Sequence, residues 1–122
     1  MEDIKQQQLE VLKEASTYCV NVIRVIDTVV PELLGDKKDD TDEYFRMTVD
    51  GINTSFEMYN STKSLLAGEG ITIDEASVNE CVKSLSAAVQ NNEDSAKAEA
   101  LQKIKEFIKA FKEAADKMIS IN

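Results

Sequence analysis

The amino-acid sequence predicts an all-α protein, an antiparallel four-helix bundle. Apolar residues recur at alternating spacings of three and four residues in four separate segments, which is the pattern of helices that bury one face. One proline and four glycines leave few positions that would interrupt long helices. No segment of useful length alternates apolar and polar residues as a strand does. At 122 residues the chain has the size of one domain, which we place at residues 1–122.

The first predicted helix is long and contains Pro31 near its end. Proline lacks a backbone N–H and its ring crowds the carbonyl four residues back, so we expect the helix to kink at Pro31 or to end just before it. Gly35 is a suitable stop, because glycine readily adopts the left-handed conformation that closes many helices. The apolar stripe of this segment is Leu12, Ala15, Cys19, Val22, Ile26, Val29 and Leu33.

The second predicted helix follows a charged connector at residues 36–41. Asp40 with Glu43 three residues later predicts a capping box at its start, and Thr41 is the alternative N-cap. The glycine-containing run 67–70 ends the helix. Its apolar stripe is Phe45, Val49, Ile52, Phe56, Tyr59 and Leu66.

The third and fourth predicted helices complete the bundle. Thr72 with Glu75 predicts a capping box for the third helix, and Asn92 or Asp94 is the expected N-cap of the fourth. Short connectors between amphipathic helices favour antiparallel neighbours packed at shallow angles. The two apolar stripes are Val78, Cys81, Leu85 and Ala88 in the third helix, and Leu101, Ile104, Ile108, Phe111, Ala115 and Met118 in the fourth.

The chain contains no histidine, and this absence excludes most chemistry that helical bundles perform. Di-iron and haem bundles use histidine ligands, and serine or cysteine nucleophiles of the triad type need a histidine base. Cys19 and Cys81, some sixty residues apart and without histidine, cannot fill a tetrahedral zinc site. We therefore expect no catalytic residue, no metal and no cofactor.

The formal charge of −9 is concentrated in the first half of the chain. An acidic surface is repelled by phosphate backbones and by anionic lipid, so we expect neither nucleic-acid nor membrane binding. The polar N-terminal residues do not resemble a signal peptide, and no stretch has the apolar length of a membrane span. These features, with two cysteines at apolar positions that favour buried thiols over a disulfide, predict a cytoplasmic protein.

A second apolar strip on the second helix is the candidate partner-binding site. By about 100° per residue, the strip lies nearly opposite the core stripe. Tyrosine and methionine are enriched at interfaces, and a glycine in mid-helix usually marks close backbone approach. The partner would be another protein or a second copy of the chain as a homodimer. The competing interpretation is that neighbouring helices of the monomer cover the strip. Its residues are Tyr44, Met47, Gly51, Met58 and Leu65.

The function that these observations favour is a non-enzymatic helical protein-interaction module, self-associating or similar to a chaperone or adaptor. The alternative is a magnesium-dependent all-helical nucleotide hydrolase that uses acidic residues near the junction of the first two helices. Carboxylate oxygens suit magnesium or calcium, but the spacing does not match an EF-hand, and acids also favour the positive start of a helix. The residues concerned are Asp36, Asp39, Asp40, Asp42 and Glu43.

Several positions resemble a family of small bacterial all-helical proteins without assigned function. The similarity consists of Gly35, a charged connector, Phe45, the run Asp50-Gly51-Ile52, and Leu85 to Asn92 before a final amphipathic helix. It covers about residues 18–118. A tryptophan expected after the glycine is missing, and Phe56 is the nearest substitute. The resemblance implies a fold and no activity.

Overall fold

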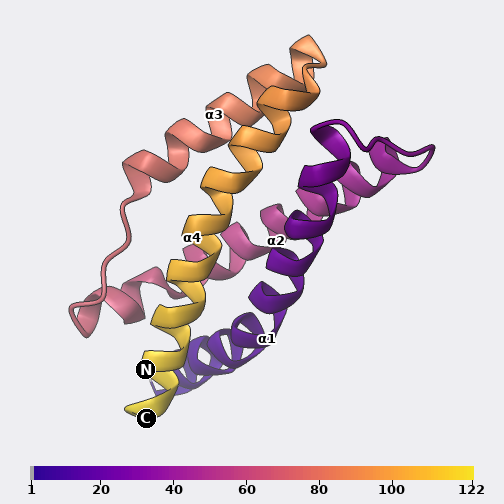
Figure 1. The fold of residues 1–122 in the computed structure, drawn as a ribbon. Coiled ribbons are helices and arrows are strands. Elements are labelled where there is room, and N and C mark those ends of the chain that lie inside the picture. The colour runs from indigo at the N-terminus through magenta and orange to yellow at the C-terminus, as the bar shows by residue number, and fades with distance from the viewer. Residues whose placement is uncertain (1) are drawn as a thin grey trace.

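The computed structural model describes residues 2–122, with side chains from residue 3 onward, and within this range it contains four helices and no strand. The helices are α1 (Glu2–Leu33), α2 (Thr41–Gly68), α3 (Glu75–Asn91) and α4 (Asp94–Ser120). They alternate in direction, so that the two ends of the chain lie at the same end of the bundle (Figure 1). The predicted all-α bundle is confirmed.

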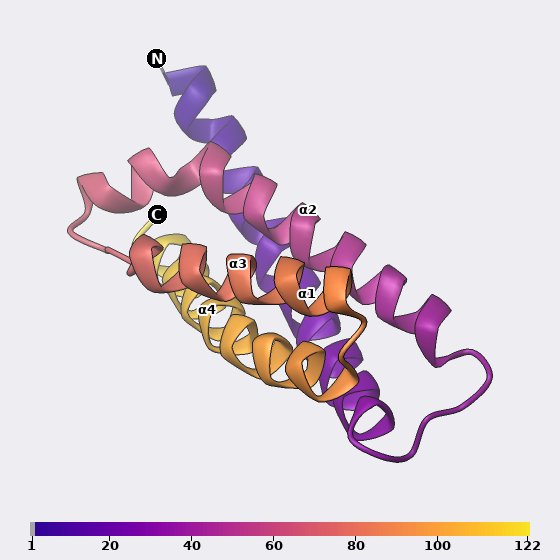
Figure 2. The same ribbon diagram turned by 90° about the horizontal axis from the view of Figure 1, so that it is seen from above.

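The helices do not surround the core evenly. Helix α1 packs against both α4 and α2, whereas α3 packs only against α4, and α2 touches α4 at a few positions. Among the described helices α2 and α3 share no backbone contact, and the second view shows them as separate rods (Figure 2). The bundle is therefore open along the edge between α2 and α3.

The extent of burial follows this arrangement. All stripe residues predicted for α1 and α4 are buried, because each of these helices has at least two neighbours. On α2 the predicted stripe residues Val49 and Phe56 are only half-buried, since they lie towards the open edge. On α3 only Leu85 and Ala88 are buried.

Four aromatic rings join α2 to α4 beneath the open edge. The ring centroids of Phe56 and Phe107 are 5.0 Å apart, and Tyr59 meets Phe107 and Phe111 edge-on at 5.3 and 5.6 Å. Offset and edge-on geometries are those that aromatic rings prefer. This cluster supplies much of the contact that α2 makes with α4.

Of the two outcomes expected at Pro31, an end of α1 just before the proline is wrong, whereas α2 ends at Gly68 within the predicted run 67–70. Helix α1 runs through Pro31 and ends two residues later at Leu33, and Gly35 follows with a positive φ of 146°. The capping box of Asp40 with Glu43 does not form, because the Asp40 side chain makes no cap hydrogen bond. Instead, the Thr41 hydroxyl accepts a hydrogen bond from the Lys38 N–H at 2.8 Å and ties the connector to the helix start.

The predicted capping box at the start of α3 is wrong. The helix begins at Glu75, so Glu75 lies at its first position rather than its third, and Thr72 lies outside it. Asp74 is the N-cap: its carboxylate accepts hydrogen bonds from the Ser77 N–H at 3.2 Å and from the Ser77 hydroxyl at 2.7 Å. These bonds favour the charged form and lower the pKa of Asp74.

Asn92 closes α3 instead of starting α4. It adopts the left-handed conformation at φ 51°, and the following N–H groups bond back to the last turn of α3. Glu93 occupies the N-cap position of α4 without a side-chain cap bond, so the expected capping by Asn92 or Asp94 is wrong.

A lysine pair connects the two loops at this end of the bundle. Lys37 of the connector forms ion pairs with Asp42 and Asp94, each at 3.1 Å. Lys97 is buried beneath Asp94, where its ammonium donates to Asn92 Oδ1 at 3.0 Å and lies 5.1 Å from the ring centroid of Phe45. The hydrogen bond from Lys37 lowers the pKa of Asp94 most, and the hydrogen bond from Lys97 lowers it further.

Candidate partner-binding site

The contact between α1 and α2 is close because α2 presents small residues to α1. A Cβ atom placed on Gly51 would lie 3.4 Å from Cγ2 of Val22 and 3.7 Å from the Tyr18 hydroxyl oxygen. Both are side-chain atoms at ordinary van der Waals distance, so the close backbone approach expected at mid-helix Gly51 is not found; the glycine faces side chains of α1 inside the monomer.

A row of buried hydroxyl residues continues this contact along α2. Thr48, Ser55 and Thr62 donate their hydroxyls to the carbonyls of Tyr44, Gly51 and Met58, four residues back in each case. The bonds satisfy the buried oxygens within α2 itself. The sequence carried a signal that our prediction missed, a seven-residue spacing of small hydroxyl side chains: Thr41, Thr48, Ser55 and Thr62.

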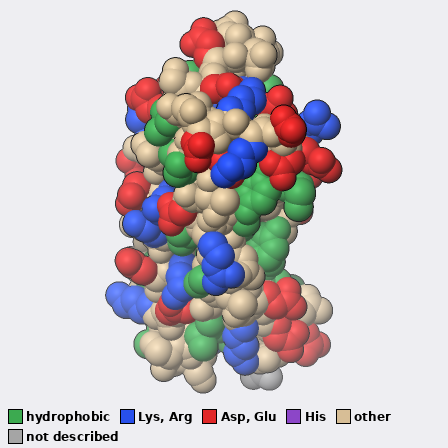
Figure 3. All heavy atoms as spheres, turned by 45° about the vertical axis from the view of Figure 1, so that its right-hand side comes forward, with side chains coloured by type: hydrophobic (Ala, Val, Ile, Leu, Met, Phe, Trp, Pro, Cys, Tyr) green, Lys and Arg blue, Asp and Glu red, His purple; other side chains and the backbone are tan. Residues whose placement is uncertain are grey.

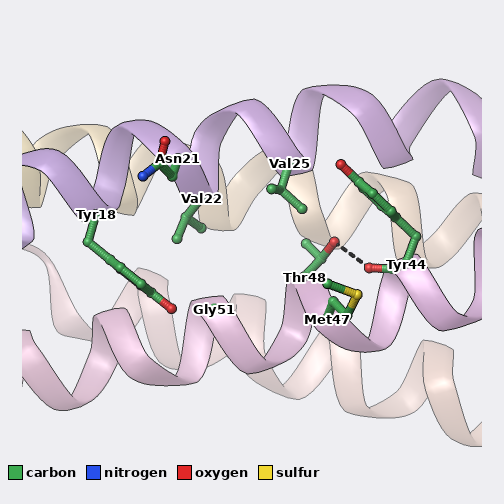
Figure 4. Close-up of a pocket in the computed structure, with 8 residues that line it drawn as sticks. All are labelled: Tyr18, Asn21, Val22, Val25, Tyr44, Met47, Thr48 and Gly51. Carbon is green, nitrogen blue, oxygen red and sulfur yellow. Dashed lines mark hydrogen bonds between the residues drawn. The ribbon is translucent and has the colours of Figure 1, made fainter.

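The small residues leave a hollow on the outer side of the two helices. Its volume is about 170 Å³, and side chains of both helices line it (Figure 4). Tyr18 and Tyr44 stand at its two ends, each extending from its own helix towards the other, while Val22 and Val25 project from α1 towards α2. We call this hollow the tyrosine groove; its lining residues are Tyr18, Asn21, Val22, Val25, Tyr44, Met47, Thr48 and Gly51.

The lining of the tyrosine groove combines apolar walls with a few polar groups. Its lining holds no carboxylate, thiol or amine, and its walls are mainly apolar. The Tyr18 and Tyr44 hydroxyls and the Asn21 amide make no hydrogen bond to any other residue of the described chain, so they remain able to bond to an incoming group. Met47 is 63% exposed at the rim of this hollow.

The five predicted strip residues divide into two groups. Tyr44, Met47 and Gly51 come together in the tyrosine groove. Met58 and Leu65 lie further along α2, where both are half-buried and pack against the core. Met58 and Leu65 are thus partly covered by the monomer itself, as the competing interpretation proposed. The strip thus follows the edge of the contact between α1 and α2 instead of a free outer face.

The contribution of α1 was missed by the sequence analysis. Tyr18 and Val25 lie seven residues apart on the flank of the α1 core stripe, a spacing that places both on one side of a helix. This pattern was available in the sequence. The spacing alone does not predict how α1 and α2 pack, and it is this packing that brings the flank of α1 to the flank of α2.

The predicted acidic connector does not gather its carboxylates. Asp36 pairs with Lys38 at 3.8 Å and Asp42 with Lys37 at 3.1 Å, and all five acidic residues are exposed. Across the part of the chain that the structure describes, no three or more Cys, Asp or Glu side chains are grouped so that they could hold a metal ion. The hydrolase alternative, which needs converging carboxylates, gains no support from this arrangement.

The two cysteines are free thiols, as the sequence analysis favoured. Cys19 is fully buried between α1 and α4, and burial raises the pKa of its thiol to about 11. A thiol of that pKa is almost wholly protonated at neutral pH and is a poor nucleophile. Cys81 is half-buried on α3.

Comparison with known proteins identifies the family. Residues 10–118 match the family model described as a domain of unknown function (DUF8042), so the chain belongs to that family. This confirms the expected resemblance to a family without assigned function. No curated protein and no solved structure shows significant similarity to the chain. None of the helices in residues 2–122 is both long and apolar enough to cross a membrane.

Proposed function

We propose that the protein is a non-enzymatic helical interaction module that binds another polypeptide through the tyrosine groove, in the manner of a chaperone or adaptor. The observation that carries this proposal is an apolar hollow between two tyrosines, with Met47 exposed at its rim. A groove of this size accepts one or two apolar side chains of a partner, and the tyrosine hydroxyls supply hydrogen bonds at its edge.

The side chains of the groove support this role. Methionine adapts its shape to different neighbours, and tyrosine contributes a large contact area with little conformational entropy to lose. The surface charge of −9 disfavours nucleic acid and anionic lipid as alternative partners. With two free thiols, we place the protein in the reducing cytoplasm.

Site-specific photo-crosslinking tests the proposal. A photoreactive phenylalanine analogue is placed at Met47 in the protein expressed in its source cells. The matched control carries the analogue at Val89, an apolar residue of α3 that is 47% exposed. We expect a discrete adduct at Met47 and none at Val89, because only the Met47 position borders the tyrosine groove.

A second substitution links the adduct to the groove. Val25→Glu places a charge inside the tyrosine groove and should abolish the Met47 adduct, while circular dichroism confirms that the variant is folded. The adduct's mass distinguishes a second copy of the chain from a different protein. If no adduct forms at Met47, or if one forms equally in Val25→Glu, the groove is not the binding surface.

A further inference from the structure

Three exposed carboxylates follow the outer side of α2 beside the tyrosine groove. Glu43, Asp50 and Glu57 are spaced by seven residues, and each directly precedes a residue of the predicted strip. Two helical turns separate the members of such a row, so the three acids share one side of α2. They form an acidic rim that runs parallel to the groove.

Within residues 3–122 no acid of the rim has a lysine partner, and the one basic residue among them is Arg46, three residues after Glu43 and four before Asp50. None of Glu43, Asp50 and Glu57 is in an ion pair within the described part of the chain. Glu14, which shares the outer side of α1 with Tyr18, is also exposed and in no ion pair there, and the exposed Lys13 lines the same shallow hollow. The carboxylates on both helices beside the groove are therefore available to a partner.

Helix α4 provides the contrast. It carries Glu99, Glu106 and Glu113 at the same seven-residue spacing, all exposed. Here Glu99 pairs with Lys103 at 3.4 Å and Glu106 with Lys109 at 3.9 Å, while Glu113 is in no ion pair within the described residues. Residues 1–70 hold 14 acidic and 7 basic side chains, whereas residues 71–122 hold 9 and 7. The negative charge of the molecule is thus concentrated on the half that contains the groove.

Hydrophobic side chains gather in the middle of the right-hand side of the molecule, with acidic side chains clustered above and below them (Figure 3). An apolar surface with like charges around it selects for a partner that carries apolar residues flanked by the opposite charge.

We propose that the tyrosine groove recognises an amphipathic helix of another protein whose apolar face is flanked by lysine or arginine. This inference rests on the proposed function and specifies the chemistry of its partner. Apolar side chains of the partner helix enter between Tyr18 and Tyr44, and its basic side chains meet Glu43, Asp50 and Glu57. A second copy docked through the same face would oppose acidic rim to acidic rim, which like-charge repulsion disfavours.

A displayed peptide library tests this inference without assuming a sequence. The library consists of helices of about 14 residues, roughly 21 Å long. Leucines are fixed along one face, and the flanking positions are randomised among lysine, arginine, glutamate, glutamine and serine. Selection against the wild-type protein should enrich lysine and arginine at the flanks. Enrichment of neutral or acidic flanks, or the absence of any binder, would overturn the inference.

Two triple variants carry the same change of net charge and form the matched control. Glu43→Lys/Asp50→Lys/Glu57→Lys reverses the acidic rim, and Glu99→Lys/Glu106→Lys/Glu113→Lys reverses the corresponding row on α4. For the best selected peptide we expect the rim variant to weaken binding by at least about tenfold, and the α4 variant by less than about threefold. Equal losses would mean attraction to overall charge and would refute a specific rim.

The salt dependence of peptide binding and the variant Met47→Asp complete the test. Raising the salt from about 10 to about 150 mM shortens the screening length from about 30 to about 8 Å and should weaken binding of the basic peptide. Met47→Asp should remove binding while leaving the fold intact, because the side chain is largely exposed. Undiminished peptide binding by Met47→Asp would place the peptide outside the groove.

The outcomes separate this inference from the proposed function. If the Met47 adduct contains a second copy of the chain or an acidic or neutral segment, the interaction module stands and the basic partner is wrong. If there is neither a Met47 adduct nor a peptide whose binding depends on Met47, both proposals fail.

Discussion

Helices α3 and α4 are antiparallel neighbours with the same kind of apolar stripe, yet their burial differs greatly. Eleven of the 27 residues of α4 are buried, but only two of the 17 residues of α3. Helix α4 lies between α1 and α3 and also touches α2, whereas the backbone of α3 packs against α4 alone and α3 meets α2 only through side chains, such as the Lys63–Glu75 ion pair at 3.2 Å. The comparison teaches that an amphipathic pattern predicts which face of a helix turns inward, while the number of neighbouring helices decides how far it is covered.

The largest effect is expected where α4 meets its neighbours. Phe111 is fully buried and lies edge-on to Tyr59, so Phe111→Ala should lower the free energy of unfolding by about 3–5 kcal/mol. The corresponding truncation on α3, Val82→Ala, should cost less than about 0.5 kcal/mol, because Val82 is already 38% exposed. Urea denaturation measures both.

If Phe111→Ala and Val82→Ala lost similar amounts of unfolding free energy, the contrast between α4 and α3 would be wrong. If Phe111→Ala does not fold, Ile108→Val at another fully buried position of α4 provides the graded test, with an expected loss of about 0.5–1.5 kcal/mol.

The second expected effect concerns local opening of α3. The backbone of α3 packs against α4 alone, and only two residues of α3 are buried. Its amides should therefore exchange with solvent at least about tenfold faster than those in the middle of α4. Leu85→Ala should cost about 2 kcal/mol and accelerate exchange mainly within α3. Leu101→Ala on α4 is the control and should accelerate exchange throughout the bundle. Uniform protection of α3 and α4 in the wild type would contradict the comparison.

The smallest effect concerns the loop that joins the two helices. The ion pairs of Asp94 lower its folded-state pKa below the unfolded value, so its contribution to stability is present at neutral pH and is lost as the pH falls from about 4 through the lowered pKa. Asp94→Asn should therefore lower the free energy of unfolding by no more than about 1 kcal/mol at pH 7, and this difference from wild type should vanish near pH 2.

The control for this measurement is Asp39→Asn, which changes an exposed and unpaired carboxylate of the connector. Thermal unfolding of both variants across pH 2–7 is sufficient. A difference for Asp94→Asn that persists unchanged at low pH would show that the effect does not come from the charge of Asp94.

The sequence was sufficient to predict the four helices and the core residues of α1 and α4, because three-and-four spacing depends only on the geometry of a single helix; on α2 and α3 part of the predicted stripe is only half-buried. Helix caps were less predictable, since several polar residues compete within each connector: Asp74 caps α3 where Thr72 with Glu75 was expected. The tyrosine groove was half predicted. Tyr44, Met47 and Gly51 were predicted on α2. Tyr18 and Val25 of α1 become part of the site only because α1 packs beside α2.

The hydroxyl row of α2 also affects how the two sides of the groove can move. Polar bonds between α1 and α2 occur at the two ends of the contact: the Thr41 hydroxyl donates to Glu32 at 2.7 Å, and the Gln8 amide donates to the Ser61 carbonyl at 3.0 Å. Between these ends the hydroxyls bond within α2, so no directional bond resists a small separation of the helices. The middle of the pair, beside the tyrosine groove, is therefore held by apolar packing, and a change in the width of the groove would break no hydrogen bond between α1 and α2.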